Sequence, residues 1–135
     1  MATPAIESAN PHIDIRAMAL GNDAFRRVLR TGKHQQVVVM TIQPGGEIGA
    51  EVHVAIDQLF FVIEGVAEAQ VADQTWEAVS GEVVFVEAGT RHNIVNRATA
   101  PLRLITVYAP PAHAAGTVHL TRAEADRAEH GEAGG

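Results

Sequence analysis

Short hydrophobic runs separated by turn signals fill the chain between Phe25 and Tyr108. In residues 66–71, VAEAQV, apolar side chains alternate with Glu and Gln, a pattern typical of an antiparallel strand with one face in solvent. No helical periodicity separates the runs, so the pattern predicts an all-β barrel or sandwich. Strands are expected within residues 25–31, 35–42, 50–54, 58–63, 66–79, 82–86, 91–96 and 101–108.

Both ends of the chain depart from this β pattern. Residues 1–24 are polar and contain two prolines, which predicts an N-terminal arm with at most a helical turn over residues 17–20. Near the other end, Thr121 and Glu124 match a capping box for a short C-terminal helix, which Gly131 is expected to end. The predicted organisation is an arm at 1–24, one barrel domain at 25–110, a loop and helix at 111–130, and a disordered tail at 131–135.

Composition narrows the class of protein. A chain of 135 residues, 47% of them hydrophobic, suits one domain with a packed core. A net charge of −6 disfavours nucleic acid or an anionic membrane as a partner. The chain contains no cysteine, which excludes disulfides and thiolate metal sites and fits a cytoplasmic protein. Because no basic start precedes a long apolar stretch, we expect neither a secretory signal nor a membrane span.

Polar side chains interrupt the apolar pattern in residues 51–58, EVHVAIDQ. Glu51 and His53 stand two apart, so on a strand they would share one face, where an unpaired buried charge is costly. A hairpin would then bring Gln58 beside His53, and His92 opens a later strand. Two imidazoles, a carboxylate and an amide oxygen are suitable ligands for a divalent metal ion. The alternative is a solvent-facing carboxylate with two histidines in turns.

These residues lie in two segments that resemble the two motifs of the cupin family. The first motif, G(X)5HXH(X)3,4E(X)6G, is matched at Gly45, Glu51, His53, Gln58 and Gly65. The second motif, G(X)5PXG(X)2H(X)3N, is matched at Gly81, Glu87, Gly89, His92 and Asn96. Three positions depart from the motifs, because Glu51 stands in place of a histidine, Gln58 in place of a glutamate, and Glu87 in place of a proline.

The resemblance covers roughly residues 35–108 and implies one cupin domain, a double-stranded β-helix or jelly-roll barrel with a short C-terminal helix. It also implies one divalent metal ion (Fe, Mn, Ni, Co or Zn) at ligand positions that carry over as Glu51, His53, Gln58 and His92. Cupins include dioxygenases, isomerases, decarboxylases, lyases and binding proteins, and the fold does not choose among these activities.

We therefore expect a metal-dependent enzyme, a dioxygenase or other oxidoreductase, that acts on a small organic molecule of anionic character. One alternative is an isomerase or lyase in which the metal acts as a Lewis acid. A second alternative is a non-catalytic domain that binds or senses a small molecule.

Further residues are candidates for lining or serving the site. Strand alternation places Gln36, Met40, Phe60 and Tyr108 along the cavity, although each side chain could equally serve core packing. His113 lies either in a surface loop or in a lid that brings its imidazole to the barrel mouth as an acid or base. The motif glycines are expected at tight turns: Gly45, Gly65, Gly81 and Gly89.

Hydrophobic side chains occupy both faces of the runs QQVVVMTI and QLFFVI. A small barrel buries one face of each strand, so a second copy of the chain is expected to cover the other face, which predicts a homodimer. Basic residues near the first strand are expected on a solvated face or at the rim of that dimer rather than in an anion site: Arg26, Arg27, Arg30 and Lys33.

Overall fold

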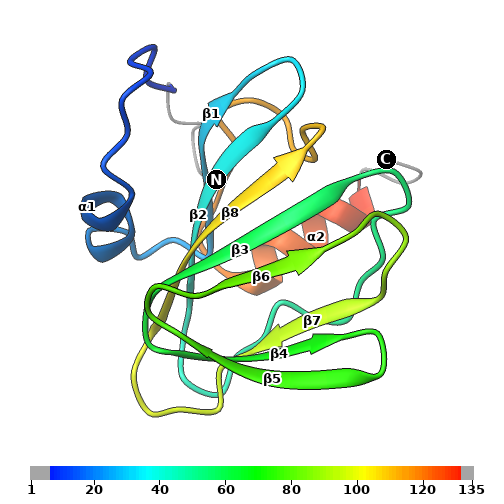
Figure 1. Cartoon of the computed structure of the whole chain (residues 1–135). Helices are drawn as coiled ribbons and strands as arrows, with labels where there is room; N and C mark the ends of the chain where they lie inside the picture. The colour runs from blue at the N-terminus through cyan, green and yellow to red at the C-terminus, as the bar shows by residue number, and fades with distance from the viewer. Residues whose placement is uncertain (1–6, 132–135) are drawn as a thin grey trace.

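The computed structural model describes residues 7–131, and its strands form two antiparallel sheets that face each other (Figure 1). The larger sheet has six strands, in the order β6 (Val83–Val86), β3 (Asp57–Glu64), β8 (Leu102–Ala109), β2 (Gln36–Ile42), β1 (Arg26–Thr31) and β9 (Val118–His119). The smaller sheet has three strands, in the order β5 (Gln74–Val79), β4 (Val66–Val71) and β7 (His92–Val95). The predicted all-β class is confirmed.

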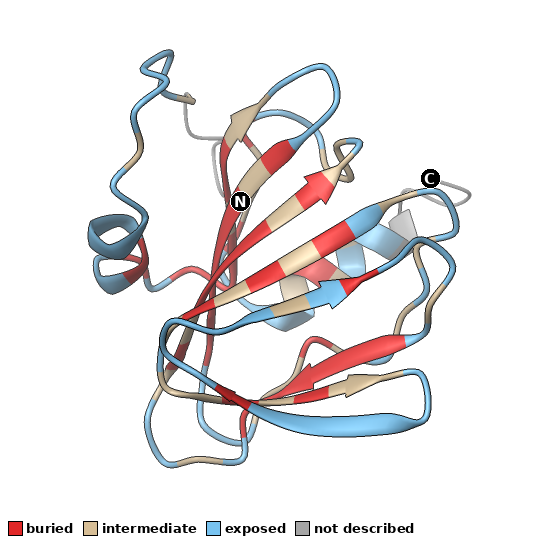
Figure 2. Cartoon of the chain, in the orientation of Figure 1, coloured by how far each residue is buried: buried red, intermediate tan, exposed pale blue. Residues whose placement is uncertain are grey.

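The core lies between the two sheets, where the inward side chains of paired strands meet. In β3 burial alternates along the strand, with Gln58, Phe60 and Val62 inside. Phe60 lies opposite Val84 of β6 and Thr106 of β8, so these three side chains share the inner face. Figure 2 shows buried positions on both sheets and an exposed stretch along the edge strand β5.

Tight turns occur at the motif glycines, as predicted. Gly45, Gly65, Gly81 and Gly89 all have positive φ, between 80° and 96°. At Gly65, between β3 and β4, a Cβ atom would also lie 2.7 Å from the carbonyl oxygen of Pro101. Both the backbone conformation and the available space therefore require glycine at this position.

A short helix, α1 (Ile15–Leu20), lies on the outer face of the larger sheet (Figure 1). The Asp14 side chain caps it by accepting a hydrogen bond from the Ala17 amide at 3.0 Å, so the helix begins before the turn predicted at residues 17–20. Ala19 is fully buried on this face and packs with Leu29, Val39 and Ile105. The arm therefore covers part of the sheet for which a second subunit was expected, while residues 1–6 of the predicted arm lie outside the described residues.

Three arginines hold the arm against the larger sheet. Arg27 Nε donates to the Asn22 side-chain oxygen at 3.3 Å, and Arg30 Nη1 donates to the Ser8 carbonyl at 3.1 Å. Arg103 Nη1 donates to the Asn22 carbonyl at 2.7 Å. Arg27 and Arg30 thus anchor the arm, which is a role that the sequence pattern did not predict.

The outer face of the larger sheet keeps an apolar patch on β6 and β3. Val83 and Phe85 of β6 are 49% and 63% exposed, and the neighbouring Leu59 and Phe61 of β3 are partly exposed. Uncharged exposed surface of this kind suits contact with a second copy. The homodimer stays a prediction, with this patch as its proposed interface.

The C-terminal segment adds β9 and the helix α2 (Arg122–Gly131), which packs its buried Ala125 into the core. Thr121 Oγ1 accepts a hydrogen bond from the Glu124 amide at 3.1 Å, as the predicted capping box requires. The Glu124 carboxylate accepts from the Leu120 amide, one residue before the position that the motif expects. Residues 132–135 of the predicted tail lie outside the described residues, and within residues 7–131 no helix is long and apolar enough to cross a membrane.

Candidate metal centre

Glu51 and His92 come together because their backbones pair directly. The Glu51 amide donates to the His92 carbonyl at 2.9 Å, and the His92 amide donates to the Glu51 carbonyl at 3.0 Å. The expectation that residues 50–54 form a strand of a hairpin with β3 is wrong, because this segment makes a single bridge at Glu51 and makes it with β7. His53 is held nearby by its carbonyl, which accepts from the Gly89 amide at 2.8 Å.

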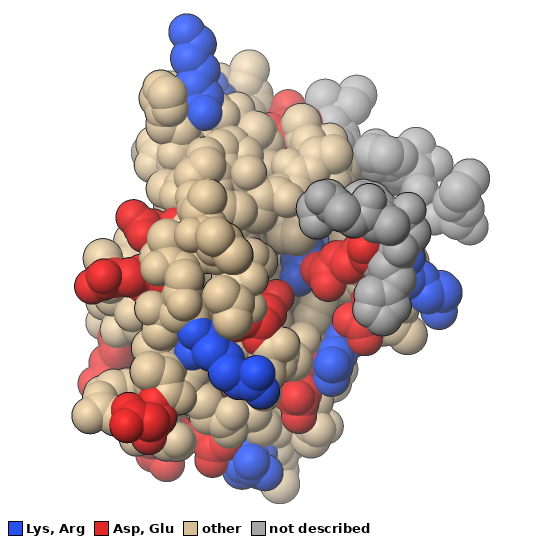
Figure 3. Space-filling view, turned by 90° about the vertical axis from the view of Figure 1, so that its right-hand side faces the viewer, with Lys and Arg blue, Asp and Glu red and all other residues tan. Residues whose placement is uncertain are grey.

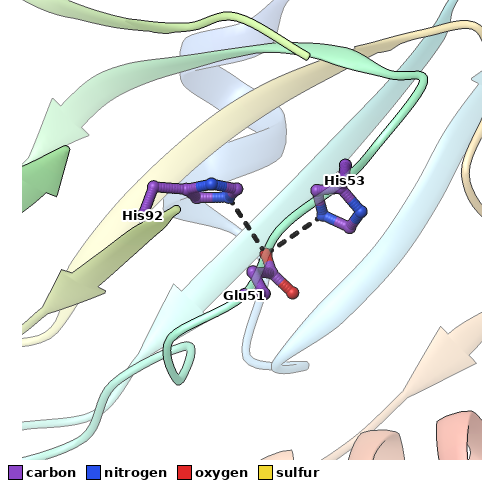
Figure 4. Close-up of side chains that lie close together, drawn as sticks. All are labelled: Glu51, His53 and His92. Carbon is purple, nitrogen blue, oxygen red and sulfur yellow. Dashed lines mark ion pairs between the residues drawn. The ribbon is translucent and has the colours of Figure 1, made fainter. Parts of the chain in front are cut away.

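The side chains of Glu51, His53 and His92 point toward one another (Figure 4). Oε1 of Glu51 lies 3.2 Å from Nε2 of His53 and 3.3 Å from Nε2 of His92. One ligand atom from each residue lies within 4.8 Å of the other two. Because metal–ligand bonds are about 2.1 Å long, two donor atoms at adjacent positions of one ion are about 3 Å apart. The three residues could therefore hold a single metal ion.

Hydrogen bonding determines which nitrogen of His92 is free. Its Nδ1 lies 3.0 Å from the Thr90 carbonyl oxygen, which can only accept, so Nδ1 carries the ring hydrogen. In the neutral ring Nε2 then turns a lone pair toward the Glu51 carboxylate, and this contact lacks the geometry of a hydrogen bond. Nε2 of His53 is likewise buried without a hydrogen-bond partner among the described residues. A cation between these acceptors would satisfy them, so the donor set fits a metal ion.

The electrostatics of the cluster keep Glu51 ionised. Burial raises the pKa of Glu51, but contact with His53 and His92 and their charge lower it to about 2. Burial lowers the pKa of His92, whereas its contacts with Glu51 and the Thr90 carbonyl raise that pKa overall. The carboxylate is consequently available as an anionic ligand throughout the physiological pH range.

Gln58, the fourth predicted ligand, is buried at the start of β3, where it lies opposite Tyr108 of β8. Its Nε2 donates to Thr106 Oγ1 at 3.0 Å, which orients the amide group. Its Oε1 is buried and has no hydrogen-bond partner among residues 7–131. This oxygen is free to ligate a metal or to accept from a bound molecule, and its ligation stays a prediction.

Of the residues predicted to line a cavity, one lies in the hydrophobic core and two lie beside the candidate metal centre. Met40 belongs to the hydrophobic core. Phe60 and Tyr108 adjoin the candidate centre, with ring centroids 5.9 Å from those of His92 and His53 respectively. These two aromatic side chains are fully buried or nearly so, and they shield one side of the imidazole pair from water.

Gln36 is fully buried and holds the loop that carries His113. Its Oε1 accepts from the amides of Ala112 and His113 at 3.2 and 3.1 Å, and its Nε2 donates to the His113 carbonyl at 2.7 Å. The His113 ring packs edge-on against Tyr108, with 5.1 Å between centroids, and its Nε2 is buried. The His113 ring is therefore held against Tyr108, and its role as an acid or base on a lid stays a prediction.

Arg26 is an interior residue that the sequence pattern did not identify. It is 2% exposed, and its Nη1 lies 3.3 Å from both His119 Nδ1 and Glu129 Oε1. The expectation of a solvated face or dimer rim is therefore wrong for Arg26. It pairs with Met40 of β2 and so shares its inward face. Arg26 stands two residues before the buried Val28, and this spacing places both side chains on the inward face of β1. The spacing could have identified Arg26, but a charged side chain on a strand is usually exposed.

Comparison with known proteins identifies the fold family. A family model of the cupin domain matches residues 38–108, the segment that contains all four predicted ligands. The chain belongs to the cupin family. Its two facing antiparallel sheets are the double-stranded β-helix that the motif resemblance implied, and that prediction is confirmed.

Individual relatives agree with this assignment. This cupin is 36% identical to the uncharacterized protein YrkC of Bacillus subtilis, over 87% of its own length and 66% of that protein's length. It is 33% identical to an uncharacterized protein of Acanthamoeba polyphaga mimivirus, over 82% of this chain and 71% of the viral protein. The crystal structure of BH2720 from Bacillus halodurans matches with a TM-score of 0.87 at 38% identity, covering 90% of this chain and 98% of that one. The chain thus spans about two thirds of the length of YrkC.

Proposed function

We propose that this cupin is a metal-dependent oxidoreductase of the dioxygenase type that acts on a small anionic organic molecule. The observation that supports the proposal is the cluster of one carboxylate and two imidazoles, whose ligand atoms lie within 4.8 Å of one another. Two histidines and one carboxylate with open positions are characteristic of non-haem iron(II) oxygenases. Iron(II) is therefore the metal that we propose.

Bound iron(II) would supply redox chemistry and open coordination positions for substrate and oxygen. The residues of the chain would supply ligation, orientation and charge. Glu51 offsets one of the two metal charges, which leaves a net positive centre that favours an anionic substrate. The Thr90 carbonyl holds His92 in the tautomer that ligates through Nε2. Phe60 and Tyr108 limit access of water beside the two imidazoles.

A Lewis-acid isomerase or lyase is the second candidate, and the position of His113 favours it. Burial, together with the charge of Arg26, lowers the pKa of His113 to about 3, so the imidazole is neutral at physiological pH. At this pKa the imidazole is a weak base, so in such an enzyme it would hydrogen-bond the substrate while the metal polarises it. Such an enzyme would turn over its substrate without consuming oxygen.

The test begins with elemental analysis of protein purified without chelator and without a nickel-binding tag. We expect one iron per chain, and loss of that iron in His92→Ala but not in His34→Ala, a variant of an exposed histidine. Protein loaded with iron(II) is then assayed in an oxygen electrode with a panel of small carboxylates and 1,3-dicarbonyl compounds. Oxygen uptake with product formation is the expected result. Turnover without oxygen uptake would refute the oxidoreductase in favour of the isomerase or lyase, and ligand binding without turnover would indicate a binding domain.

A further inference from the structure

Buried polar atoms without a hydrogen-bond partner are rare in folded proteins, and among the described residues of this chain they gather in one region. Among the described residues, five such side-chain atoms are found: Nε of Arg26, Nε2 of His53, Oε1 of Gln58, Nε2 of His92 and Nε2 of His113. They come from five separate segments of the chain, yet all of them lie inside the barrel or face into it. Their convergence indicates a ligand site larger than a single metal ion.

Tyr108 links four of these five residues. Its ring lies 5.9 Å from that of His53 and 5.1 Å from that of His113, measured between centroids. It pairs with Gln58 across the β3–β8 register, and the charge of Arg26 acts on its hydroxyl. Burial raises the pKa of Tyr108 to about 12, so its hydroxyl stays protonated and adds a donor to this region.

A metal ion satisfies three of the five atoms and leaves the other two unexplained. His53, Gln58 and His92 each offer a lone pair, which is what a metal ion needs. Arg26 offers only N–H donors and carries a positive charge, so its partner must be an acceptor, preferably an anion. The His113 ring lies 6.5 Å, between centroids, from that of His119, which contacts Arg26, and the charges of Arg26 and Glu51 both act on His113.

One edge of the Arg26 guanidinium makes hydrogen bonds, and the other edge has an N–H group without an acceptor in the described part of the chain. Its Nη1 contacts His119 and Glu129, whereas Nε on the opposite edge has no hydrogen-bond partner among residues 7–131. The Nε edge of a guanidinium presents parallel N–H groups that match the two oxygens of a carboxylate. Basic and acidic side chains are interspersed on the face shown in Figure 3. The described residues of that face therefore form no basic patch that would bind an anionic ligand in place of Arg26. The Arg26 side chain is 3% exposed, and Glu129, its carboxylate partner, is 46% exposed and screened by water.

We infer that Arg26 and His113 form a second subsite, which binds the carboxylate of a small ligand whose other end reaches the metal centre. The inference rests on the proposed metal site, and it names the substrate class as a small carboxylate with a second oxygen donor. Arg26 supplies charge and paired donors, and the nearby His113 and Tyr108 supply hydrogen bonds. The charge of Arg26 adds to the positive charge of the metal centre, so both ends of the ligand are attracted to the same interior.

The test is calorimetric titration of the full chain loaded with iron(II) under anaerobic conditions. The probes are oxalate, malonate and succinate, which can span two subsites at different lengths, and acetate, which cannot. At least one dicarboxylate should bind more tightly than acetate. Arg26→Gln should weaken that binding about 10- to 100-fold, as expected for the loss of a charge-assisted hydrogen bond. Arg30→Gln removes an equal charge from the same strand, outside the site, and should leave the affinity unchanged, and neither variant should lose metal.

Dicarboxylates that bind no better than acetate, or that bind Arg26→Gln as well as wild type, would overturn the subsite even if metal is bound. A wild-type protein that binds no metal would refute the proposed function instead. In that case metal-free protein is titrated with the same probes, and carboxylate binding that depends on Arg26 supports the subsite, whereas its absence overturns it. If circular dichroism shows that Arg26→Gln does not fold, His113→Phe decides, because it keeps the ring against Tyr108 and removes the nitrogen. It should weaken dicarboxylate binding roughly threefold to tenfold, and unchanged binding would overturn the subsite.

Discussion

Replacing Glu51 by glutamine should weaken metal binding by at least about 100-fold. The two imidazoles, 3.2 and 3.3 Å from Oε1, lower the pKa of Glu51 from 4.5 to about 2 despite its burial. This difference favours the charged carboxylate by about 3 kcal/mol, at about 1.4 kcal/mol for each factor of ten. A divalent ion among the same atoms carries as much charge as two protonated imidazoles and lies closer to the carboxylate. The side chain is 22% exposed, so solvent screens this attraction only in part.

The assay is competition with a chromogenic chelator at neutral pH, using full-length protein and one metal at a time. Glu64→Gln serves as the matched control, because Glu64 is an exposed carboxylate at the end of β3. Gln58→Ala should cost less affinity than Glu51→Gln, since it removes a neutral donor rather than a charge. Glu51→His should retain the metal, because it restores a nitrogen ligand at the position where the cupin motif has histidine.

An affinity of Glu51→Gln equal to that of wild type would refute this reasoning. The carboxylate would then lie outside the coordination shell, and the remaining site would consist of His53, Gln58 and His92. The same outcome would remove the basis for a site of two histidines and one carboxylate, and with it the preference for iron(II). A loss of affinity in Glu64→Gln of similar size would instead indicate a long-range effect of net charge.

Four further results are expected. The double variant His53→Ala/His92→Ala should keep a native circular dichroism spectrum, because the core is apolar. Mass spectrometry should find no bound metal in this variant, and stoichiometric metal would show that the metal site lies elsewhere. His113 should stay neutral in an NMR titration, because burial and the charge of Arg26 lower its pKa from 6.5 to about 3. Between these two pH values the unfolded chain binds more protons than the folded chain, so the free energy of unfolding should rise with pH across that window. An imidazole that titrates near pH 6.5 would contradict this prediction. Gly65→Ala should lower the free energy of unfolding by about 1–3 kcal/mol in urea, because of its positive φ and the nearby Pro101 oxygen; unchanged stability would show that the turn can relax. Light scattering should give a dimer mass at micromolar concentration and a monomer mass for Phe85→Glu, whereas a wild-type monomer would exclude the dimer.

The sequence by itself determined most of the strands, the glycine turns and the candidate residues for the site. Alternation of apolar and polar side chains is a local property, and it follows from the pleat of each strand, so β4 and β8 were predictable from their own residues. Positive φ is also local, which is why the glycine turns at Gly65 and Gly81 were predicted correctly. Motif spacing identified His53 and His92 as candidate ligands, because both stand at ligand positions of the cupin motifs.

Only the tertiary structure decided which of these residues meet. The pairing of Glu51 with His92 joins distant parts of the chain, and it replaced the hairpin that local order suggested. Arg26 and His113 reach the interior through contacts with α2, Gln36 and Tyr108, none of which is visible in their own segments. A charged or polar side chain is normally placed in solvent by its own hydration, so local pattern assigns it to the surface. Its burial becomes favourable only when closure of the two sheets supplies partners, and that depends on the whole fold.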